Sequence, residues 1–519
     1  YGPYSNDLCR RSNDDTLTQS AEMKSFLVGL YSRAVVQKGR QNTLKIKVIM
    51  EKKMSKSKLG ATAFVICLGA GLASADTNYG PYPITLKGYN GTKSNSVSYT
   101  GQIARHVLHD SVKKLAGTGD GGANSGRLAA EILSYFQGSD KNKSIIAPVD
   151  KGEFNIKQET LNEISSGKNL SGKTYKGIIN AWPGQMTGPD VIVSMIKKAA
   201  ATKGGFDPVT GYNYPQLISK FTMGAVSYNQ TVNNYLDGKL AADSKPNNKP
   251  YKEGAYYTGK EHSWDEAFGY WGAAAHSLNL TAKQNYDIAK MKDLTAADAN
   301  GDGLVDLKSE YNFGHAYYGA AFDKGGKTTY FNTITKSFID GRKIIANAGG
   351  EKLSDGERAE LYALAKIIGD NWEVIIAEAV FKYAGSVYKD INKLQDALSA
   401  GAETDKIYAA YGKHWGELKG FSMALQVGKN NLGATAAELN RLIGFGPVTM
   451  NNSYVTGVDS NGNYAMDRRR TWGDYQLHML KIQKMMVDEF GVKARNNDQL
   501  SELEALASSL STTESAETD

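Results

Sequence analysis

Two histidine–glutamate pairs have the spacing of metal ligands on a helix. His414 and Glu417 are three residues apart, and His262 and Glu266 are four apart. Side chains at either spacing share one face of an α-helix, so each pair could contact a single cation. Imidazole and carboxylate groups suit iron, zinc or manganese. The same spacing also occurs on solvated helix faces that bind nothing, so other features of the chain must decide.

The two pairs lie in similar segments. HSWDEAFGY at 262–270 resembles HWGELKGF at 414–421, and a Gly-Lys pair lies just upstream of each tryptophan. When Trp264 is aligned with Trp415, a glutamate, a glycine and an aromatic residue also coincide. This repetition predicts two related helical bundles that arose by internal duplication, with the tryptophan and the glycine as a shared packing frame. Independent convergence of helix packing is the alternative.

A helical period dominates residues 76–519 and predicts an all-α fold, because strand-like alternation is scarce. Ser354 and Glu357 form a capping box. They predict the start of a long helical region that reaches about residue 398, with Gly369 as the point where it could break. Another helix is expected to begin at Thr404 and to carry His414. Further segments with this period are 101–115, 189–201, 216–236, 330–348 and 472–490.

Residues 298–310, DANGDGLVDLKSE, resemble the calcium loop of EF-hand proteins. Oxygen-bearing residues occupy the odd positions around Gly303, where such a loop turns sharply. Glu310 lies one residue beyond the usual bidentate glutamate, so the loop is non-standard. We expect structural calcium here, and a plain polar turn is the alternative. The expected ligands are Asp298, Asn300, Asp302, the carbonyl of Leu304, Asp306 and Glu310.

Residues 54–75 have the three parts of a secretory signal peptide. Two lysines and an apolar run precede an Ala-Ser-Ala cleavage site that ends at Ala75. The run is too short to span a membrane as a helix. The pattern predicts a bacterial protein that is periplasmic or secreted and is cleaved after Ala75. Residues 1–53 precede the expected start at Met54, and we interpret them as a spurious extension; a genuine N-terminal extension is the alternative.

Charge and cysteine content exclude several classes of function. Residues 1–75 hold 12 of the 61 Lys and Arg residues but only 5 of the 54 Asp and Glu residues. The rest of the chain therefore carries 49 of each sign, which does not suggest a nucleic-acid partner. Both cysteines also lie in residues 1–75. The exported part is thus expected to lack disulfides, thiol nucleophiles and cysteine-ligated metal sites.

These features divide the chain into six parts. They are a spurious extension at 1–53, a signal peptide at 54–75, a first helical bundle at 76–290, a linker with the calcium loop at 291–312, a second bundle at 313–495 and a disordered acidic tail at 496–519. In the first bundle, His106 and His109 are three residues apart. They could complete a metal site if their helix lines the same cavity.

The motif Gly412-x-His414-x-x-Glu417 resembles the G-x-H-x-x-E signature of the imelysin family. This resemblance implies an exported bacterial protein with a duplicated, two-bundle all-α fold and a role in iron uptake. Members of that family have also been classed as metallopeptidases. The mature chain is in addition similar to an exported bacterial family of unknown function that is associated with imelysins. The first copy, His262-x-x-x-Glu266, is one residue longer than the signature, which puts its ligand geometry in doubt.

We therefore expect an exported protein that captures iron, or alternatively zinc, through His414, Glu417, His262 and Glu266. The implied partners are metal ions and an outer-membrane uptake receptor or other iron-uptake proteins. Two other classes stay open. A metal-dependent hydrolase of the imelysin type would use Glu417 as its base, although the chain has no H-E-x-x-H motif. A non-catalytic interaction module without a transition metal would use the aromatic faces only for packing.

Overall fold

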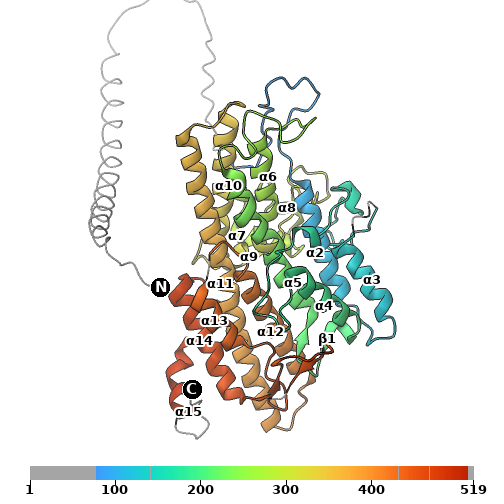
Figure 1. The fold of residues 1–519 in the computed structure, drawn as a ribbon, viewed down its shortest axis with the longest axis vertical. Helices are drawn as coiled ribbons and strands as arrows, with labels where there is room; N and C mark the ends of the chain where they lie inside the picture. The colour runs from blue at the N-terminus through green and yellow to red at the C-terminus, as the bar shows by residue number, and fades with distance from the viewer. Residues whose placement is uncertain (1–76, 139, 141, 431, 467, 512–519) are drawn as a thin grey trace, which may run out of the picture. The chain divides into compact units, whose positions relative to one another are not determined.

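The computed structural model describes residues 77–511, apart from residues 139, 141, 431 and 467. The predicted extension at 1–53 and signal peptide at 54–75 lie outside these residues. Within them the fold is all-α, as the sequence predicts (Figure 1). The α-helices are α2 (Thr100–Ala116), α3 (Ser125–Phe136), α4 (Gly188–Ala200), α5 (Tyr214–Thr222), α6 (Gly259–Trp271), α7 (Ala282–Ala289), α8 (Leu294–Ala297), α9 (Gly314–Asp323), α10 (Tyr330–Asn347), α11 (Asp355–Ser399), α12 (Asp405–Leu425), α13 (Gly433–Ile443), α14 (Trp472–Phe490) and α15 (Leu503–Ser511).

The strands in this part of the chain form short antiparallel pairs of two residues each, so they contribute little to the architecture. The pairs are β1 (Phe206–Asp207) with β2 (Tyr212–Asn213), β3 (Ser453–Tyr454) with β6 (Arg468–Arg469), and β4 (Gly457–Val458) with β5 (Tyr464–Ala465). The positions of functional side chains are therefore set by helix packing.

Helix α11 begins where the capping box predicts. The Glu357 N–H donates to Ser354 Oγ at 3.2 Å, and the Ser354 N–H donates to the Glu357 carboxylate at 2.7 Å. The helix then continues for 45 residues without a break at Gly369. A glycine inside a helix costs about 1 kcal/mol relative to alanine. Burial of the neighbouring Ile368 and Trp372 offsets this cost, so tertiary packing overrides the local preference.

The segment expected as one helix over 216–236 is more irregular. It consists of most of α5 followed by two π-helical stretches, Met223–Tyr228 and Thr231–Tyr235. Such π turns commonly occur at functional sites. Within the first stretch, a Cβ on Gly224 would lie 2.3 Å from the Ala424 Cβ of α12. The chain therefore passes α12 at a distance that only glycine permits.

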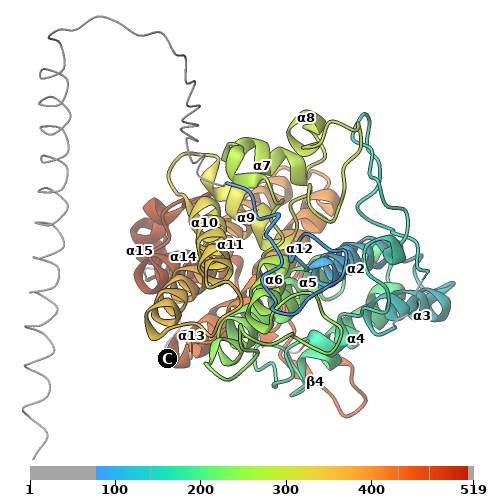
Figure 2. The ribbon, with the colours of Figure 1, turned by 90° about the horizontal axis from the view of Figure 1, so that it is seen from above.

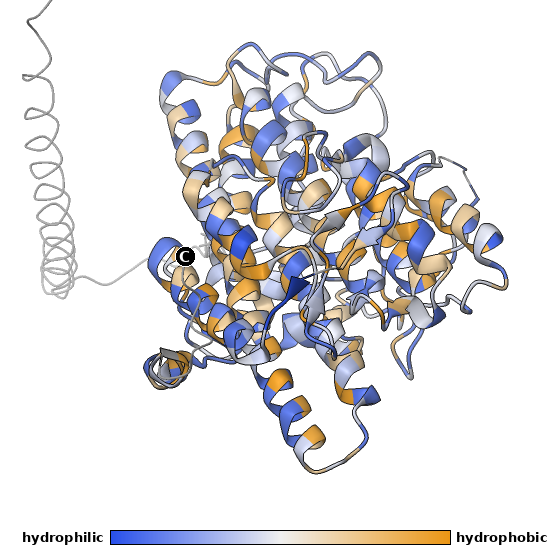
Figure 3. Ribbon diagram, turned by 60° about the horizontal axis from the view of Figure 1, so that its bottom comes forward, coloured by the Kyte–Doolittle hydropathy of each residue, from blue (hydrophilic) through white to orange (hydrophobic). Residues whose placement is uncertain are grey.

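One hydrophobic core runs through the residues predicted as separate bundles. Its buried side chains extend from Tyr79 to Ala494, and the described residues belong to one compact unit. Helix α11 packs against α10, α12 and α14, and α12 packs against α5. Figures 1 and 2 both show α10 and α11 side by side. In Figure 3, hydrophobic and hydrophilic residues alternate along the helices, as amphipathic helices around a shared core require.

Both repeated tryptophans are buried and hydrogen-bonded. Trp264 and Trp415 are both fully buried. The indole N–H of Trp264 donates to the carbonyl of Phe338, and that of Trp415 donates to the hydroxyl of Tyr475, each at 2.7 Å. Each copy therefore has a large buried ring with its single polar group satisfied.

The repeated glycines also have a common role. A Cβ on Gly269 would lie 2.8 Å from the Tyr99 Cβ beside α2, and a Cβ on Gly420 would lie 2.5 Å from the Lys220 Cβ of α5. Both positions let two helices approach more closely than any other residue would allow. This agrees with the proposed packing frame, while the duplication itself stays a prediction.

None of the helices that the structure describes combines the length and hydrophobicity needed to cross a membrane. The described part of the predicted tail contains a 3₁₀ turn at Leu500–Glu502 and helix α15. Leu500, Leu503 and Leu506 pack against the core. Their helical spacing gives this part of the tail an apolar face that its polar composition conceals.

Candidate functional site

His414 and Glu417 line one cavity of about 570 Å³. They lie one turn apart on α12, and side chains from α2, α5, α7, α9 and α11, with Lys290 and Asn497, form the rest of the wall. Helix α12, which carries both residues, is held in place by two close contacts. One is with α5 at Gly420, and the other is with the π-helical segment at Gly224. The spacing of the pair therefore does place the two side chains at one cavity.

Asp390 of α11 holds the imidazole of His414. Nδ1 of His414 lies 2.5 Å from Oδ2 of Asp390, whose side chain is 3% exposed. Metal-binding histidines commonly have such a carboxylate partner, which fixes the ring and leaves Nε2 for the metal. No partner for Nε2 is found among the described residues. Asp390 was not identified from the sequence, because it lies 24 residues earlier on another helix and no motif marks it.

Glu417 is more buried than His414 and has aromatic and basic neighbours. The residue is 6% exposed. Burial raises the pKa of the Tyr383 phenol well above its usual value, and the Glu417 carboxylate acts in the same direction. Burial lowers the pKa of Lys220 and Lys382, and the charge of Glu417 opposes that effect in both. Glu417 thus lies within the electrostatic reach of two ammonium groups.

The wall of the His414 cavity is strongly basic. Asp390 and Glu417 are the carboxylates among its described lining residues, and both face an excess of ammonium groups. At the same cavity, burial acts to raise the pKa of the Tyr286 phenol, but the charges of Lys324 and Lys290 lower it overall. A positive potential has this effect. The sequence did not reveal this feature, since the lysines come from four separate helices and from the residue after α7. They are Lys113, Lys220, Lys290, Lys382, Lys389, Lys393 and Lys413.

His262 and Glu266 do not line the His414 cavity. His262 Nε2 lies 3.7 Å from Glu266 Oε1, and its ring stacks on Tyr257 with the ring centres 4.2 Å apart. Burial lowers the pKa of His262 to about 4, against the opposing effect of Glu266. Glu266 accepts hydrogen bonds from Gln102 and Tyr251. This pair is held in a packed, hydrogen-bonded setting on α6, apart from the pair on α12.

His106 and His109 are also used for packing. Nε2 of His106 lies 3.1 Å from the carbonyl oxygens of both Gly269 and Tyr270, so this nitrogen carries the proton and donates. Nε2 of His109 lies 2.8 Å from the carbonyl oxygen of Ser219. His109 lines a smaller cavity of about 160 Å³ that shares several lysines with the His414 cavity.

The predicted calcium loop is curled around its own amides. The Asp298 carboxylate accepts from the N–H groups of Gly301, Asp302 and Gly303 at 2.8–3.1 Å. The side-chain oxygen of Asn300 also accepts from the Asp302 N–H. One oxygen of Asp302 forms an ion pair with Lys157 at 2.9 Å. Three of the predicted ligands therefore lie on one tight turn.

The other end of this loop is tied to its start and to a distant segment. Glu310 accepts from the N–H groups of Ala299 and Asp306 at 3.2 and 2.7 Å. Burial raises the pKa of Glu310, and the nearby charges of Asp306 and Asp298 act in the same direction. Val305 pairs with Ile156 in a parallel bridge. The loop thus fastens residues near 156 to the linker between the predicted bundles.

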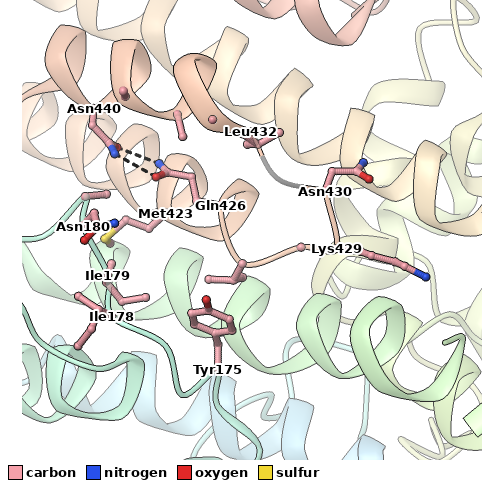
Figure 4. A pocket seen from close by; sticks show the side chains of 16 residues that line it. Tyr175, Ile178, Ile179, Asn180, Met423, Gln426, Lys429, Asn430, Leu432 and Asn440 are labelled. Carbon is pink, nitrogen blue, oxygen red and sulfur yellow. Dashed lines mark hydrogen bonds between the residues drawn. The ribbon is translucent and has the colours of Figure 1, made fainter. Parts of the chain in front are cut away.

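Across the described residues, no group of three or more histidine, cysteine or acidic side chains is arranged to hold a metal ion. A second cavity of about 500 Å³, drawn in Figure 4, contains none of the predicted ligands. Gln426 and Asn440 exchange hydrogen bonds at 2.9 and 3.0 Å across its wall, and Lys429 is its charged residue among those described. Its polar, nearly uncharged lining contrasts with the basic wall around His414.

Comparison with known proteins identifies one similar domain. Residues 196–348 match a domain of unknown function (DUF4856). This match spans α5 to α10, with Lys220, the pair on α6 and the calcium loop, but it does not reach His414. No curated protein and no solved structure matches the chain. The chain is therefore similar over residues 196–348 to a family without an assigned function, and the resemblance to imelysins stays an expectation.

Proposed function

We propose that the chain is an exported protein that captures iron, with zinc as the alternative metal, and that His414 is its principal metal ligand. The observation that carries this proposal is the pairing of His414 Nδ1 with Asp390 at the wall of a cavity. A buried carboxylate behind the ring leaves Nε2 facing the space where a ligand binds. Glu417 lines the same cavity and is the candidate for the second protein ligand.

The proposals of export and of iron binding rest on different observations. Export follows from the signal-peptide pattern at 54–75, and iron follows from the resemblance around Gly412-x-His414-x-x-Glu417. An outer-membrane receptor as partner follows from the same resemblance. The pair His262 and Glu266 is the secondary candidate, because its two groups lie 3.7 Å apart but are enclosed by tyrosines and hydrogen-bond donors.

Metal titration of the purified protein tests the proposal. Chelator-treated protein is titrated with Fe²⁺ under anaerobic conditions and with Zn²⁺, using isothermal calorimetry. We expect His414→Ala to abolish the binding that wild type shows and Asp390→Asn to weaken it about 10- to 100-fold, since that is the usual effect of losing the partner of a ligating histidine. His276→Ala is the matched control, because His276 belongs to neither candidate pair and its Nε2 contacts the carbonyl oxygen of Ala296. Unchanged affinity in His414→Ala would show that the site is wrongly assigned.

We also propose a structural calcium ion at residues 298–310. The clustering of Asp298, Asn300 and Asp302 on one turn supports the proposal. So do the two nearby carboxylates whose charges act to raise the pKa of Glu310. Calcium would compete with Lys157 for Asp302 and would neutralise this acidic cluster. The bridge from Val305 to residue 156 gives the ion a role in fastening two distant segments.

Thermal unfolding with added calcium tests the loop separately. At a calcium concentration about ten times Kd, binding to the folded state adds about 1.4 kcal/mol of stability. Asp298→Ala is expected to remove this gain. Asp459→Ala is the matched control, because Asp459 accepts from the N–H groups of Asn461 and Asn463 in a similar exposed turn elsewhere. An unfolding midpoint that calcium does not move would refute the proposal.

A further inference from the structure

Lys220 differs from the other buried lysines of the described chain. Lys220, Lys260 and Lys419 are 3%, 2% and 0% exposed. The Lys260 ammonium donates to three carbonyl oxygens at 2.6–2.7 Å, and that of Lys419 donates to one at 2.7 Å. No hydrogen-bond acceptor for the Lys220 ammonium is found among the described residues. The Lys220 side chain is buried as a whole, but its ammonium is not one of the fully enclosed unpaired groups of the described residues, so it meets the cavity without a protein acceptor.

The surroundings of Lys220 compensate its charge only in part. Its Nζ lies 5.4 Å from the ring centre of Tyr318 and 5.9 Å from that of Phe421, which gives modest cation–π attraction. Burial and the charge of Lys113 lower the pKa of Lys220 well below its usual value, and the charge of Glu417 opposes this effect. No carboxylate within the described residues lies at ion-pair distance from it. No protein carboxylate therefore pairs with Lys220, and an anion in the cavity would favour its charged form.

Lys220 lies where such a partner has room. It lines both the cavity of about 570 Å³ around His414 and the adjoining cavity of about 160 Å³. Lys113 and Lys290 are shared by the same two cavities. With its seven ammonium groups and two carboxylates, the larger cavity favours an anion over a free cation. Its size is that of an ordinary small-molecule site.

We infer that this cavity binds a small polycarboxylate anion with Lys220 as its buried anchor, and that iron binds at His414 more tightly as the complex of such an anion than as a free ion. The part of this inference that concerns iron rests on the proposed function. The anion's carboxylates would pair with the lysines through charge-assisted hydrogen bonds. In the iron complex the anion would also supply the oxygen donors that His414 and Glu417 alone do not provide.

Calorimetric titration with metal-free citrate tests the anion site. Citrate is expected to bind wild type and His414→Ala with similar affinity, and Lys220→Met is expected to weaken binding at least tenfold while it raises the midpoint of thermal unfolding. Added salt should weaken binding further. Lys260→Met is the matched control: it should lower the midpoint, because it leaves three carbonyl oxygens without their donor, yet leave citrate affinity unchanged.

Ferric citrate and inorganic phosphate complete the test. Ferric citrate is expected to bind wild type more tightly than citrate alone, and His414→Ala should remove that difference. If citrate binds through Lys220 but iron adds nothing, the proposed metal function fails and the anion site stands. If citrate does not bind, if phosphate binds in its place, or if Lys220→Met leaves citrate affinity unchanged, the inference is overturned.

Discussion

Replacement of His106 makes a quantitative prediction about stability and pH. Burial lowers the pKa of His106 from 6.5 to about 4, and His109 acts in the same direction. The unfolded chain therefore binds a proton between these values while the folded chain does not. Stability from this residue is fully present above pH 6.5 and is lost as the pH falls toward 4. At about 1.4 kcal/mol per pKa unit, the loss is about 2.5 kcal/mol between about pH 7.5 and about pH 4.5.

The packing around His106 explains why its charged form is disfavoured. The ring stacks against Phe313 with ring centres 5.3 Å apart. A Cβ on Gly272 or on Gly314 would lie within 3.0 Å of the imidazole, and both glycines have positive φ. The site therefore has no room for water around a charged ring, and it depends on two glycines that adopt a left-handed backbone.

Urea unfolding of wild type and His106→Gln at the two pH values measures the effect. Glutamine can donate to the same carbonyl oxygens but does not titrate in this range. The stability difference between the two proteins should therefore shift by about 2.5 kcal/mol in favour of the variant on going to the lower pH. A difference that stays the same at both pH values would refute the assigned burial of a neutral imidazole. A shift of opposite sign would show that His106 is charged in the folded protein.

Two further predictions concern packing. Arg342→Met should destabilise the fold by about 3–5 kcal/mol, because two fully buried carboxylates would lose their guanidinium partner. Lys336→Met removes an exposed ion pair and should leave the midpoint of urea unfolding unchanged within error. Gly420→Ala should cost about 1–3 kcal/mol through overpacking of α12 against α5 and should weaken citrate binding by displacing the adjacent lysine. Gly356→Ala meets no atom closer than 4.0 Å and should not destabilise the protein. An Arg342→Met variant as stable as wild type, or a Gly420→Ala variant that binds citrate normally, would contradict this account.

The sequence predicted what local patterns encode. The capping box at Ser354 marks the true start of α11, and the apolar period gives the all-α class together with the bounds of α14, Trp472–Phe490. The spacing of His414 and Glu417 places both at one cavity. Each of these features depends on residues within one or two helical turns, where backbone geometry alone fixes which side chains are neighbours.

Features that depend on packing between distant segments were not predictable. Asp390 contacts His414 only because α11 and α12 pack side by side in the core. The basic wall forms only when four helices and the residue after α7 meet. Lys220 gives no sign in the sequence that its side chain is buried and that its ammonium has no protein acceptor. The neutral net charge of residues 76–519 also conceals this local excess of positive charge. Such features follow from tertiary contacts rather than from composition or periodicity.

X-ray absorption at the iron edge of protein loaded with ferric citrate tests the central claim most directly. The account predicts iron coordinated mainly by oxygen with one imidazole nitrogen, and it predicts that the imidazole signal disappears in His414→Ala but persists in His262→Ala. Iron coordinated only by oxygen in the wild-type protein, or an imidazole signal that His414→Ala leaves intact, would contradict it.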